Sequence, residues 1–238
     1  GSQYAQLICR RIREVGVFAE IYPYDADPNL MDLQHMDGVV LSGGPSSVTT
    51  DTVAMPVPAW VWARSCPVLG ICYGMQAMTQ HWGGRVEQAQ RREFGHATLD
   101  VVDDTWCAAV WPQESPSVWM SHGDHVEETG DALKACARSR DGVVAAIQHV
   151  SKPYYGVQFH PEVTHTEGGA ALLTHFVINI CGCRATWQQD IIVDQLIENI
   201  RAQVGQDHVV LGASGGVDST VVAALLHRAI GDRLHCVF

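Results

Sequence analysis

The chain has 238 residues, is 47% hydrophobic and 17% charged, and carries a net charge of −11 with a pI near 5.4. This composition suits a globular protein with one full core and part of a second, and its acidity argues against a nucleic-acid partner, which usually meets a basic face. We expect no membrane span, because no run of about 18 apolar residues occurs, and no signal peptide, because Arg10, Arg11 and Arg13 interrupt the first segment.

Hydrophobic periodicity predicts alternating helices and strands along most of the chain. In chain order we expect a helix at 4–15, strands at 17–22, 38–41 and 67–71, a helix at 73–82, strands at 85–102, 118–121, 133–138, 143–149 and 154–159, helices at 168–180 and 187–204, and a β–α–β unit at 208–211, 217–230 and 234–238.

This order of elements is typical of an α/β fold with a mostly parallel or mixed sheet flanked by helices. The helical pattern breaks near Cys183. We therefore expect one domain over residues 1–183 and the first β–α–β unit of a second doubly wound α/β domain over residues 187–238.

The segment 70–74, Gly-Ile-Cys-Tyr-Gly, has the form G-x-C-x-G between a predicted strand and a predicted helix. Flanking glycines permit the sharp turn of a nucleophile elbow, and a helix N-terminus favours the thiolate form of a cysteine. An ordinary buried cysteine at a strand end is the alternative.

A base for this thiol is available in the segment 160–162, His-Pro-Glu, which ends another predicted strand. Pro161 imposes a turn that can bring the Glu162 carboxylate back to the His160 imidazole. A nucleophile, a base and a carboxylate that orients the base form a catalytic triad. We therefore predict that Cys72, His160 and Glu162 act together.

Four segments with these residues occur in a fixed order: SGGP at 42–45, GICYGMQ at 70–76, SHGD at 121–124 and HPE at 160–162. Together they resemble the class I glutamine amidotransferases over residues 1–183. The resemblance implies that Cys72 attacks the side-chain amide of glutamine, that His160 transfers protons and that Glu162 orients it. It also implies that the backbone N–H groups of Gly44 and Tyr73 form the oxyanion hole. The residues that it implies for glutamine binding are Gln76, Ser121, His122, Gly123 and Asp124.

A second glycine-rich loop lies at 211–220, LGASGGVDST, between a predicted strand and helix. Such a loop can cradle a polyphosphate, but the Gly-Lys-Ser/Thr ending of a Walker A loop is absent. It resembles the pyrophosphate loop of the ATP pyrophosphatases, which implies ATP and Mg²⁺ as cofactors. The implied ATP-binding residues are Ser214, Gly215, Gly216, Val217, Asp218, Ser219 and Thr220.

The order of the two motif sets, the opening at 1–4 and the segments 92–95 and 160–166 are similar to the GMP synthetase family. That resemblance implies an enzyme that uses glutamine, ATP and xanthosine monophosphate (XMP) to make GMP, and that forms a homodimer. Complete members of the family begin with a strand that is missing here and continue beyond residue 238, so we expect a fragment without synthetase activity of its own.

Other functional classes stay open on the sequence. The same triad serves a stand-alone glutaminase or γ-glutamyl hydrolase, and the second loop also occurs in other glutamine-dependent synthetases of the ATP-pyrophosphatase type. A binding module that keeps the elbow only as scaffold is a third class.

The eight cysteines do not form a disulfide pattern, so we expect reduced thiols and a cytoplasmic location. The closest pair, Cys181 and Cys183, lacks a second pair with zinc-type spacing. We therefore predict no structural metal site, apart from the Mg²⁺ that accompanies ATP.

Overall fold

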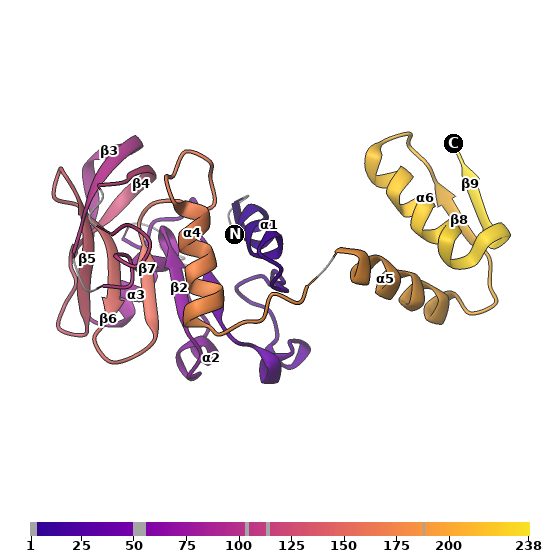
Figure 1. The fold of residues 1–238 in the computed structure, drawn as a ribbon, viewed down its shortest axis with the longest axis horizontal. Helices are drawn as coiled ribbons and strands as arrows, with labels where there is room; N and C mark the ends of the chain where they lie inside the picture. The colour runs from indigo at the N-terminus through magenta and orange to yellow at the C-terminus, as the bar shows by residue number, and fades with distance from the viewer. Residues whose placement is uncertain (1–3, 50–55, 103–104, 113–114, 188) are drawn as a thin grey trace. The chain divides into compact units, whose positions relative to one another are not determined.

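The structure is a computed structural model that describes residues 4–49, 56–102, 105–112, 115–187 and 189–238, apart from the side chains of residues 30, 89–93, 189–192 and 195 (Figure 1). Residues 1–3 of the predicted motif at 1–4, and the side chains of Arg92 and Glu93, therefore lie outside the described part. The chain divides into a larger unit, Gly1–Ala185, and a smaller unit, Thr186–Phe238.

The larger unit is built on one mixed sheet. Its strands are β1 (Val39–Leu41), β2 (Val68–Ile71), β3 (Arg85–Val101), β4 (Ser117–Glu128), β5 (Leu133–Ser139), β6 (Val144–His149) and β7 (Tyr154–Val157). In the described part of the chain the strand order is β1-β2-β7-β6-β5-β3-β4. The neighbours β1, β2 and β7 run parallel, and the remaining pairs are antiparallel. The predicted α/β class with a mixed sheet is confirmed, and the parallel part is confined to these three strands.

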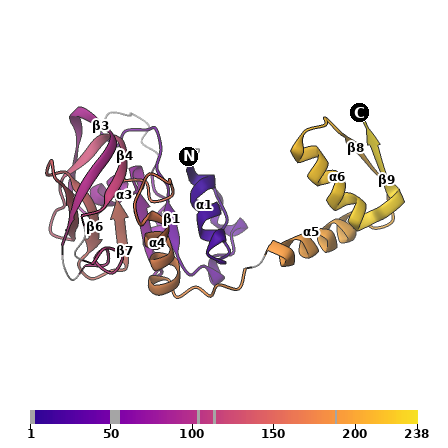
Figure 2. The same ribbon diagram turned by 45° about the horizontal axis from the view of Figure 1, so that its top comes forward.

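Helices cover both faces of the parallel strands. They are α1 (Tyr4–Glu14), α2 (Ala59–Trp62), α3 (Tyr73–His81) and α4 (Gly169–Thr174), which continues as a π-helix (His175–Ile180); two 3-10 turns lie at Pro28–Leu30 and Leu33–His35. Helices α1 and α4 lie side by side (Figures 1 and 2), and their residues Ile8 and Leu172 share a core with Leu69 of β2. On the other face, Met75 of α3 shares a core with Val68. Alternate side chains of β2 are thus buried on opposite faces, as expected of a central parallel strand.

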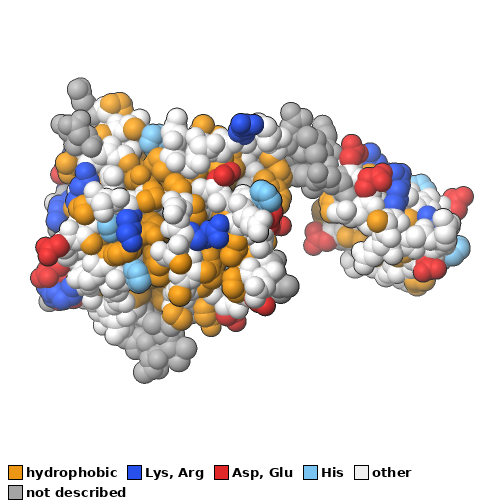
Figure 3. All heavy atoms as spheres, turned by 90° about the horizontal axis from the view of Figure 1, so that it is seen from below, with side chains coloured by type: hydrophobic (Ala, Val, Ile, Leu, Met, Phe, Trp, Pro, Cys, Tyr) orange, Lys and Arg blue, Asp and Glu red, His pale blue; other side chains and the backbone are white. Residues whose placement is uncertain are grey.

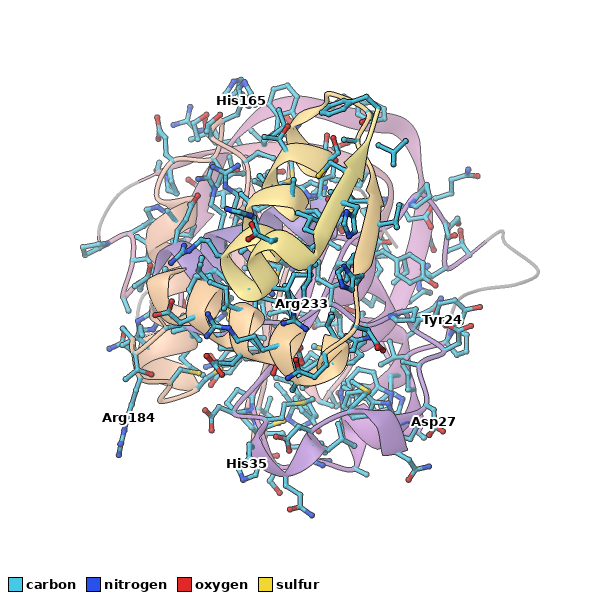
Figure 4. All side chains as sticks on the ribbon, turned by 90° about the vertical axis from the view of Figure 1, so that its right-hand side faces the viewer. Tyr24, Asp27, His35, His165, Arg184 and Arg233 are labelled. Atoms are coloured by element: carbon cyan, nitrogen blue, oxygen red, sulfur yellow. The ribbon has the colours of Figure 1, made fainter. Side chains whose placement is uncertain are left out.

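The predicted strand at 17–22 is wrong, because this segment has no regular secondary structure. A strand needs a hydrogen-bonding neighbour, and among the described strands β1 pairs only with β2. The Ala19 carbonyl instead accepts hydrogen bonds from the Arg13 guanidinium, at 2.6 and 2.9 Å. Further along, Tyr24 and His35 lie at the periphery of the larger unit (Figure 4).

Two other elements differ from their predicted extents. The strand expected at 118–121 continues as β4 to Glu128, since alternate side chains stay buried along it. The helix expected at 168–180 widens into a π-helix over its second half, where the N–H of Cys181 reaches the carbonyl of Phe176.

The smaller unit contains the predicted β–α–β unit. Its elements are α5 (Gln189–Val204), β8 (Val209–Gly212), α6 (Val217–Ile230), a 3-10 turn (Gly231–Arg233) and β9 (Leu234–Val237). Strands β8 and β9 pair in parallel. Ile197 of α5 packs with Ala229 and Ile230 of α6 in a small core against the sheet. On the opposite face of β8, Val210 is 71% exposed.

The side chains on the surface are mixed in character. On the face shown in Figure 3, single Lys and Arg side chains are scattered among hydrophobic ones in the larger unit. No described helix has the length and apolar character that crossing a membrane requires.

The contact between β1 and α3 generates a stability prediction. A Cβ added at Gly74 would lie 2.3 Å from the carbonyl oxygen of Leu41. We therefore expect Gly74→Ala to reduce the free energy of unfolding of the larger unit by about 1–3 kcal/mol, the usual cost of overpacking. Guanidinium unfolding followed by tryptophan fluorescence measures this change.

The comparison variant is Gly212→Ala in β8 of the smaller unit, where an added Cβ meets nothing within 4 Å. It should change the free energy of unfolding by no more than about 0.5 kcal/mol. Equal stability of Gly74→Ala and the parent chain would show that the close approach of β1 and α3 is not a constraint.

Candidate active site

Cys72 lies at the turn between β2 and α3 in a strained backbone conformation. Its φ is 51° and its ψ is −107°, and it is the one non-glycine residue with positive φ in the described part of the chain. A Cβ at Gly70 would lie 2.6 Å from the backbone nitrogen of Met75. Strand and helix therefore approach too closely for larger residues, and the N–H of Cys72 donates to the carbonyl of Val157 at 2.8 Å. These contacts hold the turn that places the thiol at the carboxyl end of β2.

His160 and Glu162 form a buried pair just beyond β7. The Nδ1–H of His160 donates to Oε1 of Glu162 at 2.7 Å, and the two side chains are 6% and 0% exposed. The Nε of Arg11, on α1, donates to the backbone carbonyl of Glu162 at 3.1 Å. The structure thus brings the predicted base and its predicted carboxylate into direct contact.

The electrostatics of His160 favour its charged form. Burial acts to lower the pKa of His160, but hydrogen bonds to Cys72 and Glu162, together with the negative charge of both groups, outweigh it and raise this pKa from 6.5 to about 10. The imidazole therefore carries two protons at neutral pH and can stabilise negative charge on the neighbouring sulfur.

Three parallel strand ends meet at this point. A Cβ added at Gly43, in the turn after β1, would lie 3.5 Å from the Cβ of Cys72 and 3.2 Å from the Cε1 of His160. Of the predicted oxyanion donors, Tyr73 follows Cys72 and begins α3, and Gly44 follows Gly43 in the turn after β1. The carboxyl ends of parallel strands are where α/β proteins usually place ligands.

Among the predicted glutamine-binding residues, Gln76, His122 and Asp124 are buried, and Ser121 and Gly123 are partly exposed. The Nε2 of Gln76 donates to the Asp124 carbonyl at 2.8 Å and to the Oε1 of Gln158 at 3.1 Å. The Asp124 carboxylate accepts from the Ser47 hydroxyl at 2.6 Å and from the N–H of Val48 at 3.2 Å. Both side chains therefore tie β4 to its neighbours, and Asp124 holds the segment that follows the turn at 42–45.

Residues 121–124 lie within β4. The thiol of Cys72 points at the carbonyl of Ser121, at 3.8 Å. Burial is the main cause that lowers the pKa of His122 from 6.5 to about 4. This imidazole is therefore neutral at neutral pH. Gly123 follows it in the same strand.

In the smaller unit, the predicted ATP-binding residues occupy the turn between β8 and α6 and the first turn of α6. The hydroxyls of Ser214 and Ser219 lie 3.2 Å apart, and the hydroxyl of Thr220 donates to the Gly216 carbonyl at 2.9 Å. Gly215 has a φ of +76°, and a Cβ added there would meet nothing within 4 Å. Val217 and Asp218 open α6, which begins without a side-chain cap. The turn is thus exposed and shaped by its own short hydrogen bonds.

Sequence reasoning did not find several residues that support the site. These are Arg11, Ser47 and Thr166, whose side chains bond to Glu162, to Asp124 and to the backbone of His160. Only Thr166 lies in a segment that the motifs single out, the run at 160–166. The contact between Arg11 and Glu162 joins residues 151 positions apart, and no local pattern predicts it.

No group of three or more His, Cys, Asp or Glu side chains in the described ranges is placed to hold a metal ion.

Comparison with known proteins places this geometry in a family. The profile of "Glutamine amidotransferase class-I" matches residues 1–180, and that of "NAD synthase" matches residues 190–238. Two curated relatives, from Francisella philomiragia and Francisella tularensis subsp. novicida, are named GMP synthase [glutamine-hydrolyzing]. They are 50% and 49% identical to this chain over all 238 residues. The chain spans 46% of the length of each of them.

A solved structure agrees with the larger unit. It is described as a GMP synthase subunit from Thermoplasma acidophilum, and it superposes with a TM-score of 0.65 at 31% sequence identity. The match covers 76% of this chain and 90% of the other. The chain therefore belongs to the class-I glutamine amidotransferase family.

Proposed function

We propose that residues 1–183 hydrolyse the side-chain amide of glutamine, with Cys72 as nucleophile, His160 as acid and base, and Glu162 as the group that orients His160. The observation that carries this proposal is the buried 2.7 Å contact between His160 and Glu162, beside a cysteine with a φ of 51°. Nucleophile, base and carboxylate thus occur together on the ends of adjacent strands.

In the first half of the reaction, Cys72 attacks as the thiolate, with its proton held on His160. The sulfur bonds to the amide carbon of glutamine and the C=O electron pair moves to oxygen. The backbone N–H groups of Gly44 and Tyr73 receive that oxyanion, and one such donor is typically worth about 2.7–4 kcal/mol. The C–N bond then breaks, and His160 gives its proton to the departing ammonia. In the second half, water attacks the carbonyl carbon of the γ-glutamyl thioester and His160 takes a proton from that water. The C–S bond then breaks, its electron pair returns to the Cys72 sulfur, and glutamate leaves.

We propose that Ser121, His122 and Gly123 hold the substrate glutamine, because β4 passes the Cys72 sulfur at Ser121. Gln76 and Asp124 belong to the same set, but their side chains are bonded to protein groups. They contribute by fixing β4 and the loop at 47–49 around the substrate.

We further propose that residues 187–238 begin the ATP pyrophosphatase domain of a GMP synthase. The exposed turn at 213–216 and the uncapped start of α6 fit a polyphosphate, since they offer backbone N–H groups and no side chain fills the space at Gly215. Residues 214–220 would hold ATP with Mg²⁺. ATP would transfer its adenylyl group to the C2 oxygen of XMP and release pyrophosphate, and ammonia from the Cys72 site would then displace AMP to give GMP, in a protein that forms a homodimer. All eight cysteines are free thiols, which suits the cytoplasm.

Removing the thiol should separate the two activities. We expect Cys72→Ala, made in the full gene product that contains this chain, to abolish glutamine hydrolysis and glutamine-driven GMP formation, because the thioester needs this sulfur. GMP formation driven by added ammonium should continue. Release of glutamate and appearance of GMP measure the two reactions.

Cys9→Ala is the matched control, since Cys9 is equally buried but only donates to the Ala19 carbonyl. It should keep both reactions. Glutamine consumption without GMP from either nitrogen source in the parent protein would overturn the synthase and leave a glutaminase. Persistent glutamine hydrolysis in Cys72→Ala would overturn the nucleophile.

The charge of Glu162 should control the protonation of His160. In Glu162→Gln the carboxylate charge disappears while burial remains, so the pKa of His160 should fall from about 10. NMR of the ring of His160 across pH 5–11 measures this shift.

The same raised pKa makes the stability of the fold depend on pH, because the folded state binds the proton of His160 more tightly than the unfolded state does. This contribution to the free energy of unfolding should be fully present below pH 6.5 and lost as the pH rises through about 10.

Glu128→Gln serves as the control, because Glu128 is exposed and pairs with Arg85 at 2.6 Å. That change should leave the titration of His160 as in the parent. A His160 that titrates near 6.5 in the parent, or identically in parent and Glu162→Gln, would contradict the charged pair.

A further inference from the structure

Thr166 closes a ring of three hydrogen bonds around the backbone of His160. The N–H of His160 donates to the Trp119 carbonyl at 3.1 Å, the N–H of Trp119 donates to the Thr166 hydroxyl oxygen at 3.1 Å, and that hydroxyl donates to the His160 carbonyl at 2.7 Å. Thr166 is 6% exposed. One buried hydroxyl therefore satisfies both a donor on β4 and an acceptor at the proposed base.

The same strand is attached to this turn at a second point. The N–H of Glu167 donates to the Ser117 carbonyl at 2.9 Å, and the N–H of Ser117 donates to Oε2 of Glu167 at 2.9 Å. The turn after β7 is thus attached to β4 at both Ser117 and Trp119. Strand β4 also accepts a hydrogen bond from the Cys72 thiol at the Ser121 carbonyl. It therefore contacts both the proposed nucleophile and the turn that carries the proposed base.

We propose that Thr166 is a positioning residue that sets the place of the His160 imidazole relative to the Cys72 sulfur, acting through the backbone of His160. This inference rests on the proposed glutamine hydrolysis. Without the hydroxyl, the Trp119 N–H and the His160 carbonyl lose a buried partner each, and the turn that carries His160 can shift from β4. An error of about 1 Å in such a placement can cost about 100-fold in rate.

The role of Thr166 differs from that of another buried threonine. The hydroxyl of Thr79 also donates to a backbone carbonyl, that of Met75 at 2.9 Å, but this bond lies within α3. Thr79 is 0% exposed, and its hydrogen bond stays inside one helix. It therefore reports what the loss of one buried hydroxyl does to stability alone.

The test compares Thr166→Val, Thr166→Ser and Thr79→Val in the full gene product, with kcat and KM for glutamine hydrolysis and the melting temperature measured for each. We expect Thr166→Val to lower kcat by about 10-fold to 100-fold with KM nearly unchanged. Thr166→Ser keeps the hydroxyl and should recover most of kcat. Thr79→Val should lower the melting temperature while keeping kcat.

Equal kcat in the parent and in a folded Thr166→Val would overturn the positioning role while leaving glutamine hydrolysis intact. Failure of Thr166→Ser to recover kcat, although it folds like the parent, would also overturn it. Absence of glutamine hydrolysis in the parent would instead overturn the proposed function, and the positioning role with it.

Discussion

The strained turn at Cys72 is the constraint on which the rest of the site depends. A residue other than glycine at a φ of 51° typically costs about 1–3 kcal/mol and persists only where its surroundings enforce it. The enforcement comes from Gly70 and Gly74, which let β2, α3 and β1 approach closely, and from the Cys72 N–H bound to the Val157 carbonyl. This packing directs the thiol toward the carboxyl ends of three parallel strands, where the turn after β1 and the turn after β7 also arrive.

The antiparallel strand β4 holds the turns that end the parallel strands in their positions at the site. Its backbone at Trp119 holds the turn of His160, its carbonyl at Ser121 meets the Cys72 thiol, and its carboxylate at Asp124 holds Ser47. A parallel sheet alone would bring the strand ends together without fixing the distances between the side chains of the turns that follow them. Against the effect of burial, the hydrogen bonds and negative charge of Cys72 and Glu162 then raise the pKa of His160 and favour its protonated form. The positions of the site residues therefore depend on β4 and the parallel strands, whereas the charge beside His160 comes from residues in the turn after β7 and from Cys72.

Local patterns in the sequence were sufficient to predict the elements that form the proposed site. The strand–turn–helix around Cys72, the pair at His160 and Glu162, and the β–α–β unit of the smaller unit each depend on neighbours a few residues apart. The segment 17–22 has the composition of a strand, yet it lacks a pairing partner among the described strands. The contacts of Arg11 with Glu162 and of Ser47 with Asp124 join residues 151 and 77 positions apart, so only the folded chain shows them.

The most direct test of the account is the labelling of the protein by an electrophilic diazoketone analogue of glutamine, followed by peptide mass analysis of all eight cysteines. A nucleophile that recognises glutamine should give one adduct, on Cys72, and excess glutamine should suppress it. Cys107 and Cys136, whose pKa values burial raises, should stay unmodified. Adducts spread over several cysteines, or labelling of Cys72 that glutamine does not slow, would contradict the account.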